Sequence, residues 1–349
     1  MSVLLFSDLH IHPHKKKEER REDCLKVLDW VFDVAKENNI QNILFGGDLF
    51  HDRYKIDVPT YQRTFETLKN RLDGKFKLWL LLGNHDMWFN DDTSISSVFP
   101  LSSLPGIRII SKPEQIVIDG IAWDFIPFTH NPLVSLDTLS DQPETADYAL
   151  GHIALDGAIL HGTTMSDVVI EHDNDMKIID SSVFKRYKQV FLGHYHAEQK
   201  IGNVEYIGSP LELNFGECYQ EKHLIIFDHH KNEKTYIANN FSPKHLVVKK
   251  EDLHKVDLNN NFVQIYVGDI SSTELVELRN NVLEKNKLGS LEIKKEKKEI
   301  KEDVIRDAKA FMNNEGEMLE NYVKEMGFGD LDRDKLLQIG KQICAMNVE

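Results

Sequence analysis

The sequence has little that would place it in a membrane or in a disulfide-stabilised fold. Its longest uninterrupted aliphatic or aromatic run, Leu78 to Leu82, is far shorter than the roughly 20 residues that a membrane-spanning helix needs. Three cysteines, Cys24, Cys218 and Cys344, lie far apart without a CxxC pair, which excludes a disulfide scaffold and a cysteine-based zinc module. The N-terminus also lacks the basic and apolar regions of a signal peptide. We therefore expect a protein of the reducing cytoplasm.

Basic residues are in the minority, because 42 Lys and Arg stand against 57 Asp and Glu and the net charge is −15. Such a chain does not attract a polyanion as a whole, since that attraction depends on clustered Lys and Arg. Any role with nucleic acid must depend on metal ions, a local basic patch or a partner. The chain also lacks a GxxxxGK[ST] loop, which excludes ATP hydrolysis by the P-loop route.

Apolar runs and amphipathic stretches alternate over the first part of the chain. They predict strands at 3–6, 42–45 and 77–82, with helices at 22–37 and 60–72. This order indicates an α/β domain with parallel strands, whose ligands gather beyond the carboxyl ends of the strands. Shorter and closer runs then predict further strands, partly antiparallel, in a two-sheet core with helices outside: 107–110, 115–118, 121–126, 148–150, 189–192, 204–207 and 223–227.

The length of 349 residues exceeds what one hydrophobic core usually organises, so smaller modules are expected beside one large domain. We predict that the large domain spans 1–240. A small β-α-β module follows at 241–300, with a helix near 272–283 between two strands. Residues 301–349 are predicted to form two or three amphipathic helices, split by Gly327-Phe328-Gly329.

Five short motifs follow the apolar runs: Asp8-Leu9-His10, Gly47-Asp48, Gly83-Asn84-His85-Asp86, Gly151-His152 and Gly193-His194-Tyr195-His196. Because each follows a predicted strand, a common sheet could bring all five to one rim. In an extended chain, residues i and i+2 point the same way, so the D-x-H and H-x-H pairs would each present two ligands together.

Seven side chains of these motifs are candidate metal ligands: Asp8, His10, Asp48, Asn84, His152, His194 and His196. Seven suffice for two ions with four protein ligands each if the Asp48 carboxylate bridges. The mixture of imidazole, carboxylate and amide groups suits Mn²⁺, Fe or Zn better than Mg²⁺. Two such ions about 3.5–4 Å apart form a common centre for the hydrolysis of phosphate esters.

The order D-x-H, G-D, G-N-H-D, G-H and G-H-x-H resembles the signature of calcineurin-like metallophosphoesterases, and it spans residues 8–196. This resemblance implies a four-layer α/β/β/α sandwich. Within that superfamily, Gly47-Asp48-Leu49-Phe50-His51-Asp52 followed by Pro59 resembles the nuclease subunit of the SbcCD type, which acts on DNA ends with an SMC-like ATPase. The narrower resemblance covers residues 1–230 and is architectural beyond them, where the module at 241–300 has the size and place of the capping, DNA-binding domain of these nucleases. The compact length is similar to the phage recombination nucleases of this group, which implies the host cytoplasm if a phage encodes the chain.

The resemblance also implies a role for each site residue. The first ion would be held by Asp8, His10, Asp48 and His196, and the second by Asp48, Asn84, His152 and His194. Mn²⁺ is the expected metal, with Mg²⁺ as an alternative. His85 is not a ligand in the family but assists the departing oxygen, and His51 lies near the phosphate in some relatives. In the fourth motif, His161 competes with His152 for the ligand position.

The implied activity is that of a two-metal DNA exonuclease and endonuclease subunit in recombination and double-strand-break repair. Water activated by the ions would attack phosphorus while His85 donates a proton to the leaving sugar oxygen. Asp86 would either orient His85 or cap the turn after the strand. Two other functions stay open: a phosphatase or small-molecule phosphodiesterase of the same superfamily, and a non-catalytic DNA tether. The modules beyond residue 240 argue against the first, and the unbroken motifs argue against the second.

Three partner surfaces are also expected. The basic residues after the first motif are either a solvated helical turn or contacts to DNA phosphates: Lys15, Lys16, Lys17, Arg20 and Arg21. The C-terminal helices either pack onto the chain's own domains or bind the coiled coil of an SMC-like ATPase of the SbcC type, which we favour. The resemblance implies a homodimer through the helices at 22–37 and 60–72, where Trp30, Tyr61 and Phe65 are either contact or core residues.

Overall fold

The computed structural model describes residues 1–13, 18–89, 92–142, 145–160, 163–164, 177–295 and 335. Residues Met1–Lys294 form one compact unit, and a second unit covers Lys295–Glu349. The predicted C-terminal helices, the three lysines at 15–17 and His161 lie outside the described residues, so what the sequence indicates for them stays a prediction. Each helix in the described part of the chain is too short or too polar to span a bilayer.

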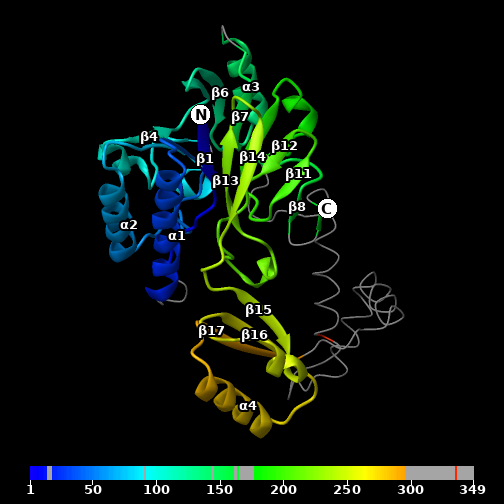
Figure 1. The fold of residues 1–349 in the computed structure, drawn as a ribbon. Helices are drawn as coiled ribbons and strands as arrows, with labels where there is room; N and C mark the ends of the chain where they lie inside the picture. The colour runs from blue at the N-terminus through cyan, green and yellow to red at the C-terminus, as the bar shows by residue number, and fades with distance from the viewer. Residues whose placement is uncertain are drawn as a thin grey trace. The chain divides into compact units, whose positions relative to one another are not determined.

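The first of two large sheets has six strands in the order β14-β13-β1-β2-β3-β4. Four strands run parallel: β1 (Ser2–Phe6), β2 (Asn42–Phe45), β3 (Lys77–Leu81) and β4 (Ile107–Ile110). Two antiparallel strands extend the sheet beside β1: β13 (His223–Asp228) and β14 (Glu233–Ala238). The crossover helices α1 (Glu18–Glu37) and α2 (Val58–Arg71) lie side by side (Figure 1). The predicted β-α-β-α-β order is confirmed.

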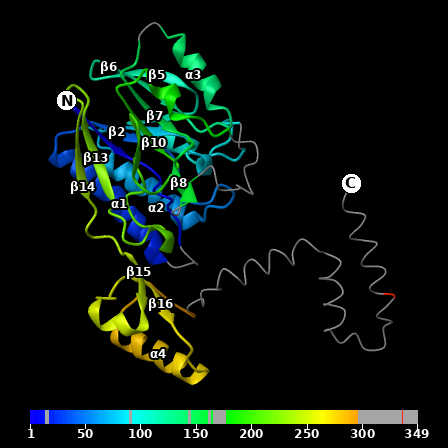
Figure 2. The same cartoon turned by 90° about the vertical axis from the view of Figure 1, so that its right-hand side faces the viewer.

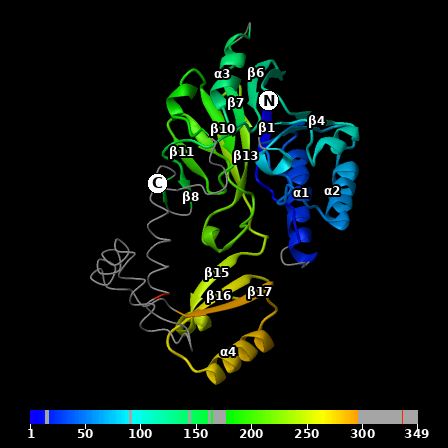
Figure 3. The same cartoon turned by 180° about the vertical axis from the view of Figure 1, so that it is seen from behind.

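The second sheet also has six strands, in the order β11-β12-β10-β7-β6-β5. The inner strands run parallel: β6 (Ile121–Ile126), β7 (Tyr148–His152), β10 (Gln189–Gly193) and β12 (Val204–Tyr206). The edges are antiparallel: β5 (Glu114–Ile118) and β11 (Gln199–Ile201). Helix α3 (Pro132–Ser140) follows β6 (Figure 3), and β8 (Ile159–Leu160) pairs with β9 (Thr163–Thr164). Short 3-10 helices fill the connections: η2 (Asn84–Asp86), η3 (Phe99–Ser103), η5 (Ser181–Phe184), η6 (Phe215–Glu217) and η7 (Lys250–Lys255).

The two sheets pack face to face around one apolar core, to which Leu5 and Leu44 of the first sheet and Phe125 of the second contribute. The opposite face of the first sheet packs against α1 and α2, and the opposite face of the second against α3. The layers therefore follow the order helix, sheet, sheet, helix, and the predicted α/β class with mixed sheets is confirmed. Three side chains that were considered for a dimer interface are partly buried against the first core, as packing within the chain requires: Trp30, Tyr61 and Phe65.

A third sheet follows the two large ones, with the strands β15 (His245–Lys249), β16 (Phe262–Val267) and β17 (Ser290–Lys295). It shares a small apolar core with α4 (Ser272–Lys285), which lies beside it in Figure 2. Helix α4 begins at Ser271, whose hydroxyl accepts from the Glu274 amide in a capping box. Strand β15 adds to the predicted β-α-β pattern. This sheet belongs to the same compact unit as the large ones, so the predicted domain boundaries remain predictions.

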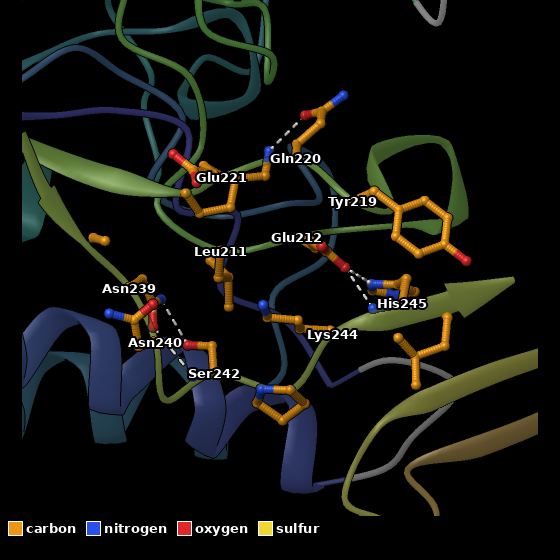
Figure 4. A pocket seen from close by; sticks show the side chains of 14 residues that line it. Leu211, Glu212, Tyr219, Gln220, Glu221, Asn239, Asn240, Ser242, Lys244 and His245 are labelled. Atoms are coloured by element: carbon orange, nitrogen blue, oxygen red, sulfur yellow. Dashed lines mark hydrogen bonds and ion pairs between the residues drawn. The ribbon is translucent and has the colours of Figure 1, made fainter. Parts of the chain in front are cut away.

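A pocket of about 350 Å³ lies where the chain passes from the large sheets to the small sheet. The Tyr219 hydroxyl donates a hydrogen bond to the Val247 carbonyl at 2.6 Å. Figure 4 shows the Glu212 carboxylate pointing to His245, whose backbone amide donates to it. The pocket lining contains none of the seven predicted metal ligands. It does contain Lys222, which connects it to the metal centre described below.

Candidate metal centre

The predicted ligands come from two sheets, so the expectation of a single common sheet was wrong. Asp8, Asp48 and Asn84 follow β1, β2 and β3 of the first sheet, whereas His152 ends β7 and His194 follows β10 of the second. The parallel strands of both sheets end on the same side of the sandwich. Packing of one sheet on the other therefore brings the two sets of strand ends together.

One half of the site gathers around the ring of His10. Its Nε2 atom lies 3.5 Å from Asp48 Oδ2 and 3.9 Å from Asp8 Oδ1. The Nε2 atom of His196 lies 3.1 Å from the same His10 nitrogen. These four residues are the set that the sequence predicted for the first ion.

The other half gathers around the side chain of Asn84. Its Oδ1 atom lies 3.0 Å from His152 Nε2 and 3.2 Å from His194 Nδ1. His152 Nε2 is also 3.4 Å from Asp48 Oδ2, which is the oxygen that approaches His10. Asp48 thus contacts both halves, as expected of a bridging carboxylate. His194 and His196 face different halves, as the resemblance implied, whereas the expectation from spacing that an extended H-x-H pair points one way was wrong.

The backbone of several ligands is held in the left-handed region, where side chains other than glycine are uncommon. The φ angles are 53° at Asp8, 47° at His10, 62° at Asp48 and 96° at His194. Conformations of this kind cost on the order of 1–3 kcal/mol each and cluster at functional sites. Backbone hydrogen bonds between the first two motifs stabilise them: the Asp8 amide donates to the Gly47 carbonyl at 2.9 Å, and the His10 amide to the Asp48 carbonyl at 3.1 Å.

Glycines permit the close approach of these loops. A Cβ atom at Gly83 would lie 2.1 Å from Asp48 Oδ1, and one at Gly47 would lie 2.5 Å from His152 Nδ1. Neither contact is possible for a side-chain carbon, so both positions need glycine for the site to close.

The centre is buried, and its charges act on one another at short range. Burial raises the pKa of the Asp8 carboxyl above its ordinary value. Burial would also raise the pKa of Asp48, but the imidazole of His152 holds that pKa well below its usual range. Burial lowers the pKa of His152, yet the Asp48 carboxylate raises it to about 9. Burial and the His152 ring lower the pKa of His194 to about 3.

The donor set fits divalent cations. Three groups of side chains could each hold an ion, because within each group the carboxylate and imidazole ligand atoms lie within 4.8 Å of one another. Every one of these groups includes Asp8 or Asp48. The two facing Nε2 atoms of His10 and His196 both present a lone pair when the rings are neutral and carry their protons on Nδ1. Two lone pairs at 3.1 Å are stabilised by a cation that both nitrogens bind.

Comparison with known proteins agrees with this geometry. The family model described as calcineurin-like phosphoesterase matches residues 1–198, more than half of the chain. The chain belongs to the calcineurin-like phosphoesterase family. This family uses two metal ions, which accounts for the two halves that share Asp48.

Two of the similar proteins are named as subunits of nucleases. The chain is 25% identical over 241 residues to exonuclease subunit 1 of Enterobacteria phage T4, which covers 69% of this chain and 68% of that protein. It is 25% identical over 292 residues to a subunit of the nuclease SbcCD of Escherichia coli, covering 73% of this chain and 72% of that protein. Among solved structures, a dimetal phosphatase from Danio rerio is 10% identical and has a TM-score of 0.42, covering 68% of this chain and 98% of that chain.

In this phosphoesterase, His85 and Asp86 take different positions beside the metal ligands. The His85 ring donates from Nδ1 to the His51 carbonyl at 2.5 Å. The Asp86 carboxylate accepts hydrogen bonds from the amides of Gly83, Asp48 and Leu49 at 2.8–3.0 Å. Of its two predicted roles, the contacts match the cap, because the His51 carbonyl and not Asp86 orients the His85 ring. Burial and the nearby Asp48 carboxylate raise the pKa of Asp86 to about 7.

A row of stacked histidines extends from His85 through His51 to His12, and of these three only His12 was not singled out from the sequence. The His51 ring stacks on His12, with ring centroids 4.3 Å apart, and lies 5.9 Å from the His85 ring. His12 stands two residues after His10, so the sequence D-x-H-x-H contained the signal for it.

Glu217 was missed altogether, although it contacts a predicted ligand. His196 donates from Nδ1 to Glu217 Oε1 at 2.9 Å, which leaves Nε2 to face His10. The other Glu217 oxygen accepts from Lys222 Nζ at 2.8 Å and from Ser209 Oγ at 3.1 Å. Burial would raise the pKa of Glu217, but the bonds from His196 and Lys222 lower it to about 2. Carboxylates of this kind orient metal-binding imidazoles and set their tautomer.

The two arginines predicted to contact DNA are in the interior, with Arg20 2% and Arg21 4% exposed. Arg20 donates to the Glu212 carbonyl at 2.5 Å, and its guanidinium lies over the Phe262 ring. Arg21 forms ion pairs with acidic neighbours, including Glu22 at 3.4 Å. Both guanidinium groups serve packing between α1 and its surroundings, so we exclude them from the proposed DNA surface.

Proposed function

We propose that the chain is the nuclease subunit of a DNA recombination and repair complex and hydrolyses phosphodiester bonds with two divalent cations. The observation that carries the proposal is that the seven ligand side chains, all within the family match, form two groups that share Asp48. The similarity to two nuclease subunits over about 70% of the chain supports DNA as the substrate.

The ligand sets follow from the two halves of the centre. Asp8, His10 and His196 would hold one cation together with Asp48, while Asn84, His152 and His194 would hold the other with the same carboxylate. When bound, such cations lower the pKa of water and neutralise the charge of the phosphate oxygens. The mixture of imidazole, carboxylate and amide donors suits Mn²⁺, Fe or Zn better than Mg²⁺. From the resemblance we propose Mn²⁺, with Mg²⁺ as the alternative.

The residues around the cations prepare the proton transfer. His85 commits its Nδ1 proton to the His51 carbonyl, so Nε2 is the ring atom that would donate a proton to the leaving sugar oxygen when the ring is an imidazolium; the ring then keeps its Nδ1 proton and becomes neutral. General acid assistance of this type contributes about 10²–10⁴-fold to the rate. The Asp86 carboxylate joins the loop of Asp48 to the turn that contains Asn84, and so holds both ligands in position for the reaction.

The partners are proposed from resemblance and from the relatives. One of the relatives is named as a subunit of SbcCD, which supports an SbcC-type ATPase as a partner of this chain. We assign its docking to residues 303–349 and phosphate contacts to Lys15, Lys16 and Lys17.

Deletion of 303–349 should leave metal-dependent cutting of short DNA intact and abolish co-purification with the ATPase. Full co-purification of the truncated chain would mean that the docking site lies elsewhere. A homodimer is part of the same proposal.

Nuclease assays test the proposed activity directly. The purified chain should cut linear duplex and single-stranded DNA in the presence of Mn²⁺, and Asp48→Asn should not. Hydrolysis of p-nitrophenyl esters without any cutting of DNA would assign the chain to small-molecule phosphoesterases. DNA binding without hydrolysis of either substrate would make it a tether.

A further inference from the structure

The two loops that follow His51 and His85 expose aromatic rings. Tyr54 is 63% exposed, Trp88 is 44% exposed and Phe89 is 45% exposed. The rings of Tyr54 and Trp88 meet edge to face with centroids 5.2 Å apart. The guanidinium of Arg53 lies 5.8 Å from the centre of the Tyr54 ring. Side chains of this size are usually buried, so their exposure as a group calls for a ligand.

These rings are attached firmly to the metal centre. Arg53 donates from Nη2 to the backbone carbonyl of Asn84 at 2.6 Å. The Asp52 carboxylate accepts from the Tyr54 amide at 2.9 Å and so fixes the turn that presents the ring. The Trp88 amide donates to the Ile95 carbonyl at 3.0 Å. Both aromatic residues therefore have defined backbones, and each lies three residues after a histidine of the site.

The chemistry of the patch fits unpaired nucleobases. Each phosphate of a nucleic acid has a base on the neighbouring sugar, so a strand with its phosphate at the cations places bases beside the loops that carry the ligands. Aromatic faces stack on any base with about 1–3 kcal/mol per base, and Arg adds a cation–π contribution. A chain with a net charge of −15 gains little from general attraction to phosphates, so stacking is the stronger local source of affinity.

We propose that Tyr54 and Trp88, supported by Arg53, form a stacking platform for unpaired nucleobases beside the scissile phosphate. This inference depends on the proposed nuclease function and names the form of its substrate. Bases in a duplex are stacked on one another, whereas those of a single strand or a frayed end expose their faces. The platform therefore selects single-stranded DNA or opened ends.

Matched oligonucleotides test the platform without cleavage. A short oligothymidylate and an oligonucleotide of equal length with abasic residues carry the same phosphates and differ in the bases. The full chain in EDTA should bind the first about tenfold more tightly, as measured by fluorescence anisotropy; tenfold corresponds to about 1.4 kcal/mol, which is within the range for one stacked base. Binding should also quench Trp88 fluorescence, and Trp88→Phe should remove that signal.

The variant Tyr54→Ala/Trp88→Ala should lose the preference for bases while its Mn²⁺ content stays that of the wild type. Tyr219→Ala serves as the control, since Tyr219 is also an exposed aromatic residue but lies beside the small sheet. Equal affinity of the wild type for both oligonucleotides overturns the platform, as does a double variant that keeps the preference. A double variant that loses only dimer formation by light scattering assigns the patch to a second copy of the chain.

The same measurements separate this inference from the proposed function. If base-dependent binding persists in EDTA but Mn²⁺ produces no cutting, the nuclease assignment fails and the platform stands. If Mn²⁺-dependent cutting is as fast on the abasic strand as on the base-bearing strand, the platform fails and the nuclease stands.

Discussion

Two kinds of buried carboxylate lie within the same sandwich. Asp124 and Glu217 each meet a cation of the chain itself: Arg186 Nη2 donates to Asp124 at 3.0 Å, and Lys222 Nζ donates to Glu217 at 2.8 Å. Asp8 and Asp48 have no such partner, because in the described part of the chain the basic groups within ion-pair distance of them are histidines. Lys or Arg balances the charge of the first kind, whereas the second kind faces imidazoles, which give up their protons when they bind a metal cation.

This difference indicates that structural stability and metal binding depend on different buried carboxylates. A buried ion pair with satisfied hydrogen bonds holds loops in place. Asp8 and Asp48 face imidazoles instead of Lys or Arg, and a divalent ion can replace the proton that the Asp48 carboxylate stabilises on His152. Changes in the two kinds should therefore affect different measurements, and the following variants are arranged from the largest expected effect to the smallest.

Asp48→Asn should have the largest effect on function. It removes the charge that both halves of the centre share, so bound metal should fall from two ions towards none and nuclease activity to background. Metal content by mass spectrometry and an Mn²⁺ nuclease assay measure both. Asp124→Asn is the matched control, because it removes a buried carboxylate that has its own arginine. Unchanged metal content in Asp48→Asn would contradict the bridging role.

His85→Ala should reduce cleavage by about 10²–10⁴-fold and leave two ions bound. The ring donates to the His51 carbonyl and is proposed to supply a proton without serving as a ligand. The same two assays apply, with His230→Ala as a surface histidine control. A loss of metal in His85→Ala would show that this ring is a metal ligand, and its assignment as a proton donor that binds no metal would be wrong.

Glu217→Gln should lower metal affinity by about 10–100-fold, the usual effect of a residue that orients a metal-binding histidine. Titration of the metal-free protein with Mn²⁺ by calorimetry measures this effect without cleavage. The control is Glu205→Gln, another buried glutamate, which accepts from Tyr236 Oη at 2.6 Å and lies outside the centre. Equal loss of affinity in both variants would indicate a general effect of unfolding.

Asp57→Ala should have the smallest effect, because Asp57 caps α2 by accepting from the Thr60 amide at 3.0 Å and from the Thr60 hydroxyl at 2.7 Å, and contacts no ligand of the metal centre in the described part of the chain. We expect a loss of about 1 kcal/mol in the free energy of unfolding, with metal content unchanged. Although burial opposes it, the bonds from Thr60 lower the pKa of Asp57 below its ordinary value. The cap therefore contributes above that ordinary value and its contribution is lost as pH falls through the lowered pKa. Urea denaturation at pH 7 and pH 3 should show a smaller difference between variant and wild type at pH 3.

Much of the fold could be predicted because apolar runs mark buried strands wherever they occur. The strands at 107–110, 121–126 and 262–267 lie where the sequence predicted them. The missed elements have weaker patterns. Strand β14 is an edge strand in which four of the six residues are exposed, and α3 spans nine residues, which is short for a periodic signal. Tertiary packing stabilises both.

The candidate metal ligands could be selected from the sequence alone, because ligand chemistry requires particular side chains in short motifs next to strand ends. The three-dimensional structure was needed to show that these motifs belong to two sheets and that Asp86 caps a turn. Packing also brought Glu217, 21 residues after His196, against that ring. A short motif specifies contacts between residues that are close in sequence. The contact between Glu217 and His196 instead depends on the tertiary packing of a later loop, which no local sequence pattern specifies.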